Sequence, residues 1–223
     1  MMAMELFWFS GSPFAWRAML FLEAKKLPYT QTILQASKGE HKTPGYLAMN
    51  PRGKVPVLKD DGFVLYEALA IINYLEKKHP EPALLGRTPA ETGRIWRAIS
   101  EYLYYVETQA FTIILPIFFG GLAEKTAEVK AAAEEIHKEL AGIEATLTRQ
   151  PWLAGDVMTG ADLWLYPELM LLQRAARKDI AAPLGLDLAS FAPRYKAIET
   201  WRTRIEALPY FERTYPPHWK QAA

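Results

Sequence analysis

The hydrophobic pattern near the N-terminus alternates between short apolar runs and a helical repeat. Residues 6–9 form a continuous apolar run, which is typical of a strand buried on both faces. Ser12 and Pro13 then predict the start of a helix, and apolar residues recur at helical spacing until Lys25. Residues 29–34 are rich in aromatic and β-branched side chains and predict a second strand. This stretch therefore predicts a βαβ unit.

A hairpin and a helix are expected after a polar stretch. Residues 55–58 and 63–66 are apolar runs on either side of an Asp-Gly pair, and such a pair between two runs indicates a hairpin. From Ala68 to Leu75 the apolar residues again repeat at helical spacing, and the helix should end before His79. The expected order of the N-terminal region is β-α-β followed by β-β-α.

The composition changes after a proline-rich segment. Residues 80–89 contain three prolines and show no periodicity, which indicates a linker. The patterns of residues 91–119 and 123–149 are helical, and Pro116 should bend or end the first of these helices. The predicted domains are residues 1–80, a linker at 81–89 and an all-helical domain at 90–223.

A further helix start is predicted inside the second domain. Thr159 and Asp162 are three residues apart and precede an apolar run, which is the capping-box pattern with Asp in place of Glu. The pattern predicts a helix from this point onward.

Composition excludes several kinds of chemistry. The chain has 223 residues, of which 50% are hydrophobic and 23% charged, as expected of a globular protein. It contains no cysteine, so it has no disulfide, no thiolate metal ligand, no cysteine nucleophile and no Cys-x-x-Cys pair. Histidines other than His41 are isolated in the sequence and suggest no metal site.

Charge and hydropathy indicate a cytoplasmic protein. The 26 basic and 25 acidic side chains leave a net charge of +1, which argues against nucleic acid or an anionic membrane as a partner. The N-terminus has no basic segment of the kind that opens a signal peptide. The longest uncharged run, residues 108–123, is interrupted by Pro116 and two glycines and is too short to span a membrane.

The element order and a set of short motifs resemble the cytosolic glutathione transferase family. Residues 12–17, Ser-Pro-Phe-Ala-Trp-Arg, are similar to the active-site segment of its serine-type members, the theta, zeta, phi and tau classes. Residues 39–42, 50–56 and 66–67 resemble successive glutathione-contacting stretches, and the capping box matches one in the family's second domain. The resemblance implies an α/β thioredoxin-like N-terminal domain with a mixed four-stranded sheet, followed by an all-α C-terminal domain.

The resemblance implies a glutathione transferase that uses glutathione as co-substrate and functions in detoxification, usually as a homodimer. Conjugation requires a thiol that is deprotonated at neutral pH and held beside a hydrophobic electrophile. Ser12 is the expected catalytic residue, because its hydroxyl lies at a helix N-terminus, where a sulfur anion is favoured. Ser10 ranks second, because it lies closer to the end of the strand and farther from the helix N-terminus than Ser12 does. The alternative for Ser12 is a helix cap with no chemical role.

The same resemblance assigns glutathione-binding residues. Pro56 stands where the family has a cis-proline, and Val55 before it would pair with the peptide as an added strand does. His41, Lys42 and Lys54 suit the glycyl end, and Glu67 suits the γ-glutamyl ammonium. Ala68 departs from the pattern, because the family usually has Ser or Thr here and its hydroxyl would bond the γ-glutamyl carboxylate.

The electrophile pocket is expected between the two domains. Its candidate residues are apolar or aromatic, although such residues at helical spacing more often belong to a core. They are Phe14, Tyr105, Phe111, Ile114, Leu115 and Trp219, the last if the tail folds back.

Other functions stay open at this point. The missing hydroxyl at Ala68 favours a non-catalytic relative that carries a ligand or binds a protein. A glutathione-dependent isomerase or dehalogenase is a further alternative. Trp16 and Arg17 resemble the isomerase-related class, but Pro13 and Phe14 replace part of the Ser-Ser-Cys sequence expected before them.

Overall fold

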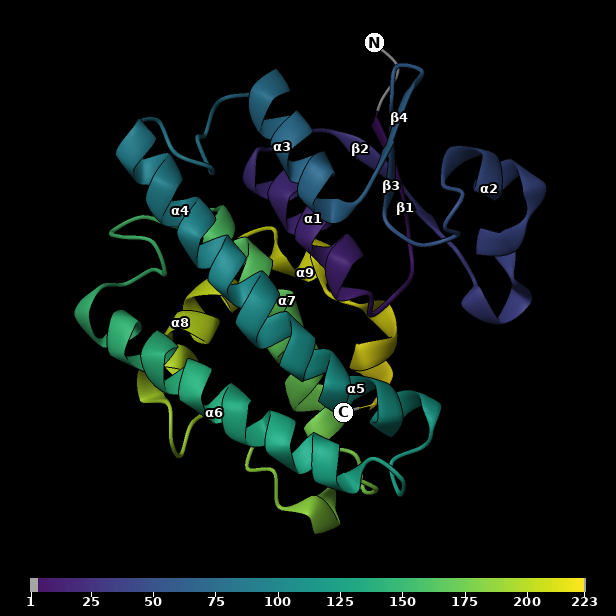
Figure 1. The fold of residues 1–223 in the computed structure, drawn as a ribbon. Coiled ribbons are helices and arrows are strands. Elements are labelled where there is room, and N and C mark those ends of the chain that lie inside the picture. The colour runs from purple at the N-terminus through teal and green to yellow at the C-terminus, as the bar shows by residue number, and fades with distance from the viewer. Residues whose placement is uncertain (1–3, 223) are drawn as a thin grey trace. The chain divides into compact units, whose positions relative to one another are not determined.

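A computed structural model describes residues 4–222 (Figure 1). Met1–Ala3 and Ala223 lie outside the described residues, so the expectation about a signal peptide rests partly on residues without a described structure. The chain divides into two compact units, one formed by the residues up to Leu84 together with those from Pro209 onward, and one formed by Leu85–Leu208.

The first unit is built on a four-stranded mixed sheet. Its elements are β1 (Met4–Trp8), α1 (Pro13–Ala24), β2 (Tyr29–Ile33), the short helical turns η1 (Ala36–Lys38) and η2 (Glu40–Lys42), α2 (Pro44–Met49), β3 (Val57–Asp60), β4 (Phe63–Tyr66), α3 (Ala68–Lys78), α9 (Phe211–Thr214) and η5 (Pro217–Ala222). The strand order is β2-β1-β3-β4, with β1 parallel to β2 and antiparallel to β3, and β3 antiparallel to β4. The predicted βαβ unit and hairpin are confirmed, and the fold class of this domain with them.

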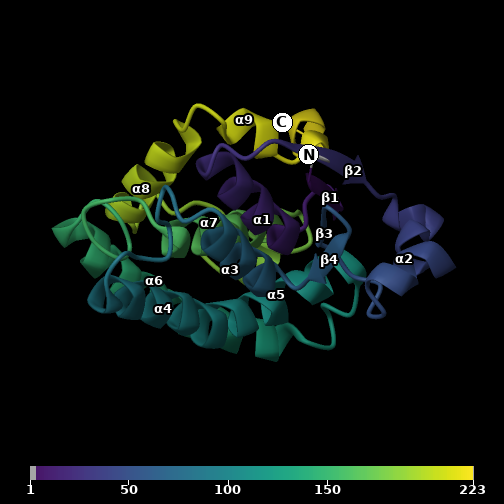
Figure 2. The ribbon, with the colours of Figure 1, turned by 90° about the horizontal axis from the view of Figure 1, so that it is seen from above.

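Helices cover both faces of this sheet. Alternate residues of a strand point to opposite faces, and Phe7 and Val57 form a cluster with Tyr46 of α2 on one of them. The helices α1 and α3 pack together on the other side, as two views show (Figures 1 and 2). The polar stretch before residue 55 thus contains α2 and two helical turns that the sequence pattern did not predict.

The C-terminal segment belongs to the first unit, whereas the sequence analysis placed it in the helical domain. Helix α9 packs against α1 (Figure 2). Trp16 of α1 donates its indole N–H to Thr214 Oγ1 at 3.0 Å, and both side chains are buried. Arg213 lies 3.3 Å from the carboxylate of Glu23. These contacts join residues far apart in sequence, which explains why no local pattern revealed them.

The linker is shorter than its composition suggested. The first unit extends to Leu84, and α4 begins at Pro89 with a capping box between Thr88 and Glu91. The buried ammonium of Lys25 contacts Glu76 Oε2 at 2.6 Å and donates to the carbonyls of His79 and Pro82 at 2.7 and 2.8 Å. The start of the predicted linker is therefore fixed to the first unit.

The second unit is helical, as predicted. Its elements are α4 (Pro89–Glu101), a π-helical segment η3 (Tyr102–Glu107), α5 (Thr108–Phe119), α6 (Thr126–Arg149), α7 (Gly160–Ala176), the turn η4 (Ala182–Leu184) and α8 (Lys196–Glu206). Pro116 does not end α5 at once, because the helix continues to Phe119 and ends where Gly120 follows with a φ of 94°.

Asp162 organises the start of α7. The predicted capping box is present, with the Asp162 carboxylate accepting from the Thr159 N–H at 2.8 Å. The same fully buried carboxylate accepts from the Leu153 N–H and from the Trp201 indole, each at 2.9 Å. Burial raises the pKa of Asp162, and these hydrogen bonds act in the opposite direction. One side chain thereby ties together α7, α8 and the loop before α7.

One continuous helix is long and apolar enough, by length and composition alone, to cross a membrane. It runs from Pro89 to Phe119, and 39% of its most apolar window is buried. Its α4 and α5 parts pack against α7, and α5 also packs against α6. The helix is thus partly buried within the second unit, and it is longer than the uncharged run of residues 108–123 on which the sequence analysis judged the length.

Candidate functional site

Two serines flank Gly11 in the loop between β1 and α1. Ser12 caps α1, and its hydroxyl oxygen accepts from the Ala15 N–H at 3.3 Å. The Ser12 N–H donates to the carbonyl of Phe9 at 3.1 Å, which closes the turn. Ser12 therefore lies at the N-terminus of α1, where the helix dipole favours an anion. Ser10 instead forms a 2.6 Å hydrogen bond with His218 Nδ1.

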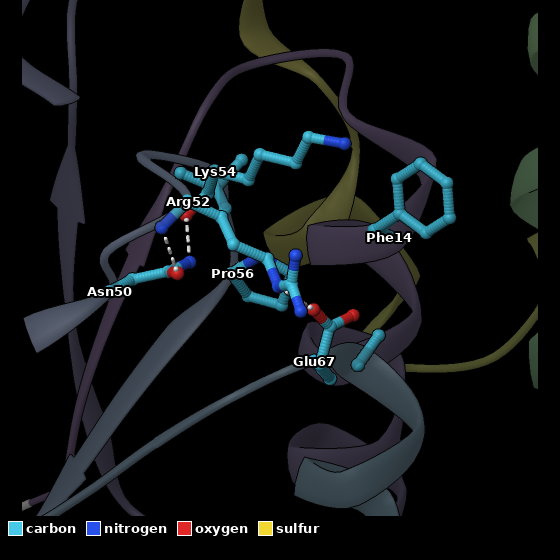
Figure 3. A pocket seen from close by; sticks show the side chains of 8 residues that line it. Phe14, Asn50, Arg52, Lys54, Pro56 and Glu67 are labelled. Carbon is cyan, nitrogen blue, oxygen red and sulfur yellow. Dashed lines mark hydrogen bonds and ion pairs between the residues drawn. The ribbon is translucent and has the colours of Figure 1, made fainter. Parts of the chain in front are cut away.

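Close to this loop, a cavity of about 230 Å³ opens in the first unit (Figure 3). Phe14, two residues after Ser12, lines it, and the other lining residues come from the segment before β3 and from the start of α3. They are Asn50, Arg52, Lys54, Val55, Pro56, Glu67 and Ala68. The structure thus brings together five of the predicted glutathione-binding residues with one predicted pocket residue.

Asn50 builds the loop that carries the cations of this cavity. Its side chain is buried, donates to the Lys54 carbonyl at 2.8 Å and accepts from the Arg52 N–H at 3.1 Å. The Tyr46 hydroxyl donates to the same Lys54 carbonyl at 2.8 Å, and burial raises its pKa, so it remains a donor at neutral pH. The Val55–Pro56 bond that follows is cis.

The opposite wall is the start of α3. Glu67 has a φ of 71°, which is uncommon for a residue with a side chain, and it makes no side-chain cap for the helix. Its carboxylate lies 3.7 Å from Arg52 Nε, and both side chains are largely exposed, so this ion pair contributes little to stability. Backbone conformations of this kind often occur where a ligand is held.

His41 and Lys42 lie outside the set that lines the cavity. The ring of His41 packs edge-on against Phe9, with centroids 5.0 Å apart. Lys42 lies against Gly53, where an added Cβ would come within 2.8 Å of the Lys42 ammonium nitrogen. Gly53 also has a φ of 56°, so this turn requires glycine. Lys42 therefore borders the loop of Lys54 without lining the cavity.

The remaining predicted pocket residues have different environments within their own units. Ile114 is buried in the helical unit, Phe111 is half-buried, and Tyr105 and Leu115 are exposed at 57% and 48%. Trp219 is buried in the first unit, where its ring packs edge-on against Trp16 at 5.5 Å. The condition that the tail folds back is thus met for Trp219.

Sequence reasoning missed three residues. Asn50 and Arg52 belong to a motif that was recognised, but neither was assigned a role. The Asn-Pro-Arg-Gly sequence is a turn signal that could have indicated Asn50 as the organiser of the loop. No local signal connects His218 to the loop of Ser12. Among residues 4–222, no three His, Asp or Glu side chains gather in a way that could hold a metal ion.

A thioredoxin-like unit with a cis-proline before β3, a serine-capped helix α1 and a cationic cavity, followed by a helical unit, is the architecture of a glutathione-binding transferase. The chain matches the family model described as "Glutathione S-transferase, N-terminal domain" over residues 11–78, and that described as "Glutathione S-transferase, C-terminal domain" over residues 103–209. It is 30% identical to "Glutathione S-transferase A" of Pleuronectes platessa, with 98% of this chain and 94% of that protein covered. The chain belongs to the glutathione S-transferase family and is an enzyme.

Other relatives and solved structures agree with the fold. The chain is 31% identical to "Maleylacetoacetate isomerase" of Pseudomonas aeruginosa, with 77% of this chain and 82% of that protein covered. A crystal structure of a glutathione S-transferase from the Antarctic clam Laternula elliptica superposes with a TM-score of 0.80 at 27% identity, covering 98% of this chain and 94% of that one. The poplar glutathione transferase F1 superposes with a TM-score of 0.83 at 22% identity, covering both chains fully.

Proposed function

We propose that the protein activates the thiol of glutathione with Ser12 and conjugates the sulfur to a hydrophobic electrophile. The observation that carries this proposal is the position of Ser12. Its oxygen accepts from the Ala15 N–H, and this leaves the O–H hydrogen for a sulfur anion at the N-terminus of α1. Family membership favours an enzyme over the non-catalytic carrier or interaction module.

The cavity beside α1 suits the rest of glutathione. Arg52 and Lys54 provide cations for its carboxylates, and Glu67 provides a carboxylate for its ammonium. Val55 is proposed to pair with the backbone of the peptide as an added strand does. With the peptide held there and Phe14 on the wall, its cysteinyl sulfur would lie towards the loop of Ser12.

The reaction balances without a redox partner. The thiol loses its proton to solvent, and the Ser12 hydroxyl donates a hydrogen bond to the thiolate. The thiolate then attacks an electrophilic carbon, a C–S bond forms, and the bonding pair leaves with the departing group. A free thiol titrates near pH 8.5, so lowering its pKa by two units requires about 2.7 kcal/mol of preferential stabilisation of the thiolate.

The test is Ser12→Ala. If the pKa of the bound thiol rises from about 6.5 to about 8.5, the thiolate fraction at pH 7 falls about 25-fold, and kcat/KM should fall with it. The thiol pKa is read from the ultraviolet absorbance of the thiolate across a pH titration. Activity is measured with a generic aromatic electrophile.

Two controls separate chemistry from helix capping. Ser12→Thr keeps a hydroxyl and should retain most of the activity. Thr88→Ala removes the side-chain cap of α4, where Thr88 Oγ1 accepts from the Glu91 N–H at 3.2 Å, and should cost stability without a change in the thiol pKa. An unchanged thiol pKa in Ser12→Ala would show that the assignment of Ser12 is wrong.

A glutathione-dependent isomerase is the second candidate, because the maleylacetoacetate isomerase of Pseudomonas aeruginosa is 31% identical to this chain. Turnover of a maleyl-type substrate, in which the sulfur adds and later leaves, would favour it over conjugation. The homodimer, the cytoplasmic location and the role in detoxification stay predictions from the family resemblance. So does an electrophile pocket formed by both domains.

A further inference from the structure

The C-terminal segment is anchored to the first unit by an aromatic cluster. Trp16 of α1 is 1% exposed, and the rings of Tyr215 and Trp219 meet it edge-on at 5.7 and 5.5 Å. Thr214, also fully buried, accepts the indole N–H of Trp16. The segment around residues 214–219 therefore has a defined position relative to α1.

This anchoring places His218 against the loop between β1 and α1. Its Nδ1 lies 2.6 Å from Ser10 Oγ. Its Cε1 would lie 2.7 Å from a Cβ added at Gly11, which has a φ of 84°. The imidazole thus packs against the backbone of the residue between the two serines. A side chain at position 11 would be strained and would also displace the ring.

The hydrogen bond distinguishes the two serine hydroxyls. Ser10 is engaged by an imidazole nitrogen, whereas Ser12 uses its oxygen to accept from the Ala15 N–H. Among residues 4–222, no acceptor is bonded to the Ser12 O–H hydrogen, so it is available to a ligand. Fixing Ser10 also restrains the turn that ends at Ser12, because the Ser12 N–H donates to the Phe9 carbonyl.

We propose that His218 is a positioning residue for thiol activation. It holds Ser10 and the backbone at Gly11, so that the Ser12 hydroxyl faces the sulfur. This role rests on the proposed function of Ser12 and adds a residue from the opposite end of the chain. His218 acts through the loop, and the proposal requires no contact between its ring and glutathione.

The test compares three substitutions of His218 and Ser10. In His218→Asn, the side-chain amide reaches the position of Nδ1 and can keep the bond to Ser10, whereas His218→Leu and Ser10→Ala both remove it. We expect His218→Leu and Ser10→Ala each to lower kcat about tenfold, as for the loss of one hydrogen bond, and to raise the pKa of the bound thiol. His218→Asn should stay within about threefold of the wild type.

Further measurements distinguish the loss of the His218–Ser10 hydrogen bond from a general disruption of the C-terminal segment. The double variant His218→Leu/Ser10→Ala should lose no more than either single variant, because both remove the same bond. KM for glutathione should not change. Lys220→Ala is the matched control in the tail. Its ammonium contacts the exposed carboxylate of Glu212 and lies 5.9 Å from the centre of the Tyr215 ring, and neither contact involves Ser10 or His218, so this variant should leave kcat and the thiol pKa unchanged.

The outcomes separate this proposal from that of Ser12. If His218→Leu keeps the wild-type thiol pKa and kcat while Ser12→Ala loses both, the positioning role is overturned and Ser12 stands. If His218→Asn fails as severely as His218→Leu, the hydrogen bond is not what matters, and the positioning role is also overturned. If Ser12→Ala retains wild-type values, the proposed function itself fails.

Discussion

Ala68 offers a test of how this enzyme holds glutathione, because the expected family hydroxyl is absent there. Ala68 is the first residue of α3 and lines the cavity, so a serine at this position would direct one oxygen towards the ligand. The cavity of about 230 Å³ has room for that atom. Ala68→Ser should therefore strengthen the binding of glutathione.

The magnitude follows from the bond that would form. A hydrogen bond to a charged carboxylate contributes roughly 1.5 to 3 kcal/mol. Serine in place of alanine in a helix costs about 0.5 kcal/mol of folding stability, but α3 is formed with and without the ligand, so this cost does not enter Kd. The gain in binding free energy is therefore roughly 1.5 to 3 kcal/mol, which corresponds to a decrease in Kd of about 12- to 160-fold. Isothermal titration of glutathione into both proteins measures this difference directly.

The matched control is Ala70→Ser, two residues further along α3 and not among the residues that line the cavity. This substitution should lower the free energy of unfolding by a similar amount, and it should leave the Kd for glutathione unchanged. Equal Kd values for Ala68→Ser and the wild type would refute the reasoning. The γ-glutamyl carboxylate would then not lie at the N-terminus of α3.

Two further predictions concern stability. Asp162→Ala leaves the N–H groups of Leu153, Thr159 and Trp201 buried without their acceptor, so urea unfolding should show a loss of about 3 to 5 kcal/mol. Asp162→Asn should lose less, and a loss below about 1 kcal/mol for the alanine variant would contradict the network. Although burial raises the pKa of Asp60, hydrogen bonds from Lys78 at 2.5 Å and Tyr74 at 2.8 Å hold it below its usual value. The stabilisation by Asp60 is therefore present above its unfolded pKa of about 4 and is lost as the pH falls through the folded pKa, so between about pH 5 and 3 the wild type should lose more stability than Asp60→Asn. Parallel curves of urea midpoint against pH would contradict this.

Local signals predicted most of the first unit. The Ser12-Pro13 pair predicted the start of α1, and the Asp-Gly turn predicted the hairpin of β3 and β4, because caps and tight turns depend on residues within a few positions of one another. The capping box at Thr159 and Asp162 was found for the same reason. The loop of Asn50 and Arg52 was recognised as a motif, yet the hydrogen bonds of the Asn50 side chain that shape it were seen only in the folded structure.

Strand starts were predicted less well. The third strand was expected from residue 55, but Val55 and Pro56 line the cavity and the strand begins at Val57. An apolar run cannot show which of its residues pair with a neighbouring strand, because pairing depends on the partner's register.

The sequence by itself determined the order of the four strands and of the helices α1 and α3, the absence of cysteine chemistry and the position of Ser12 at the start of a helix. Only the tertiary structure placed the C-terminal segment on α1 and His218 against Ser10, a hydrogen bond between residues 208 positions apart. Short sequence patterns predict caps and turns because these depend on hydrogen bonds between residues that are close in the chain. A contact between the two ends of the chain arises from the packing of the Trp16 cluster, which no short segment encodes alone.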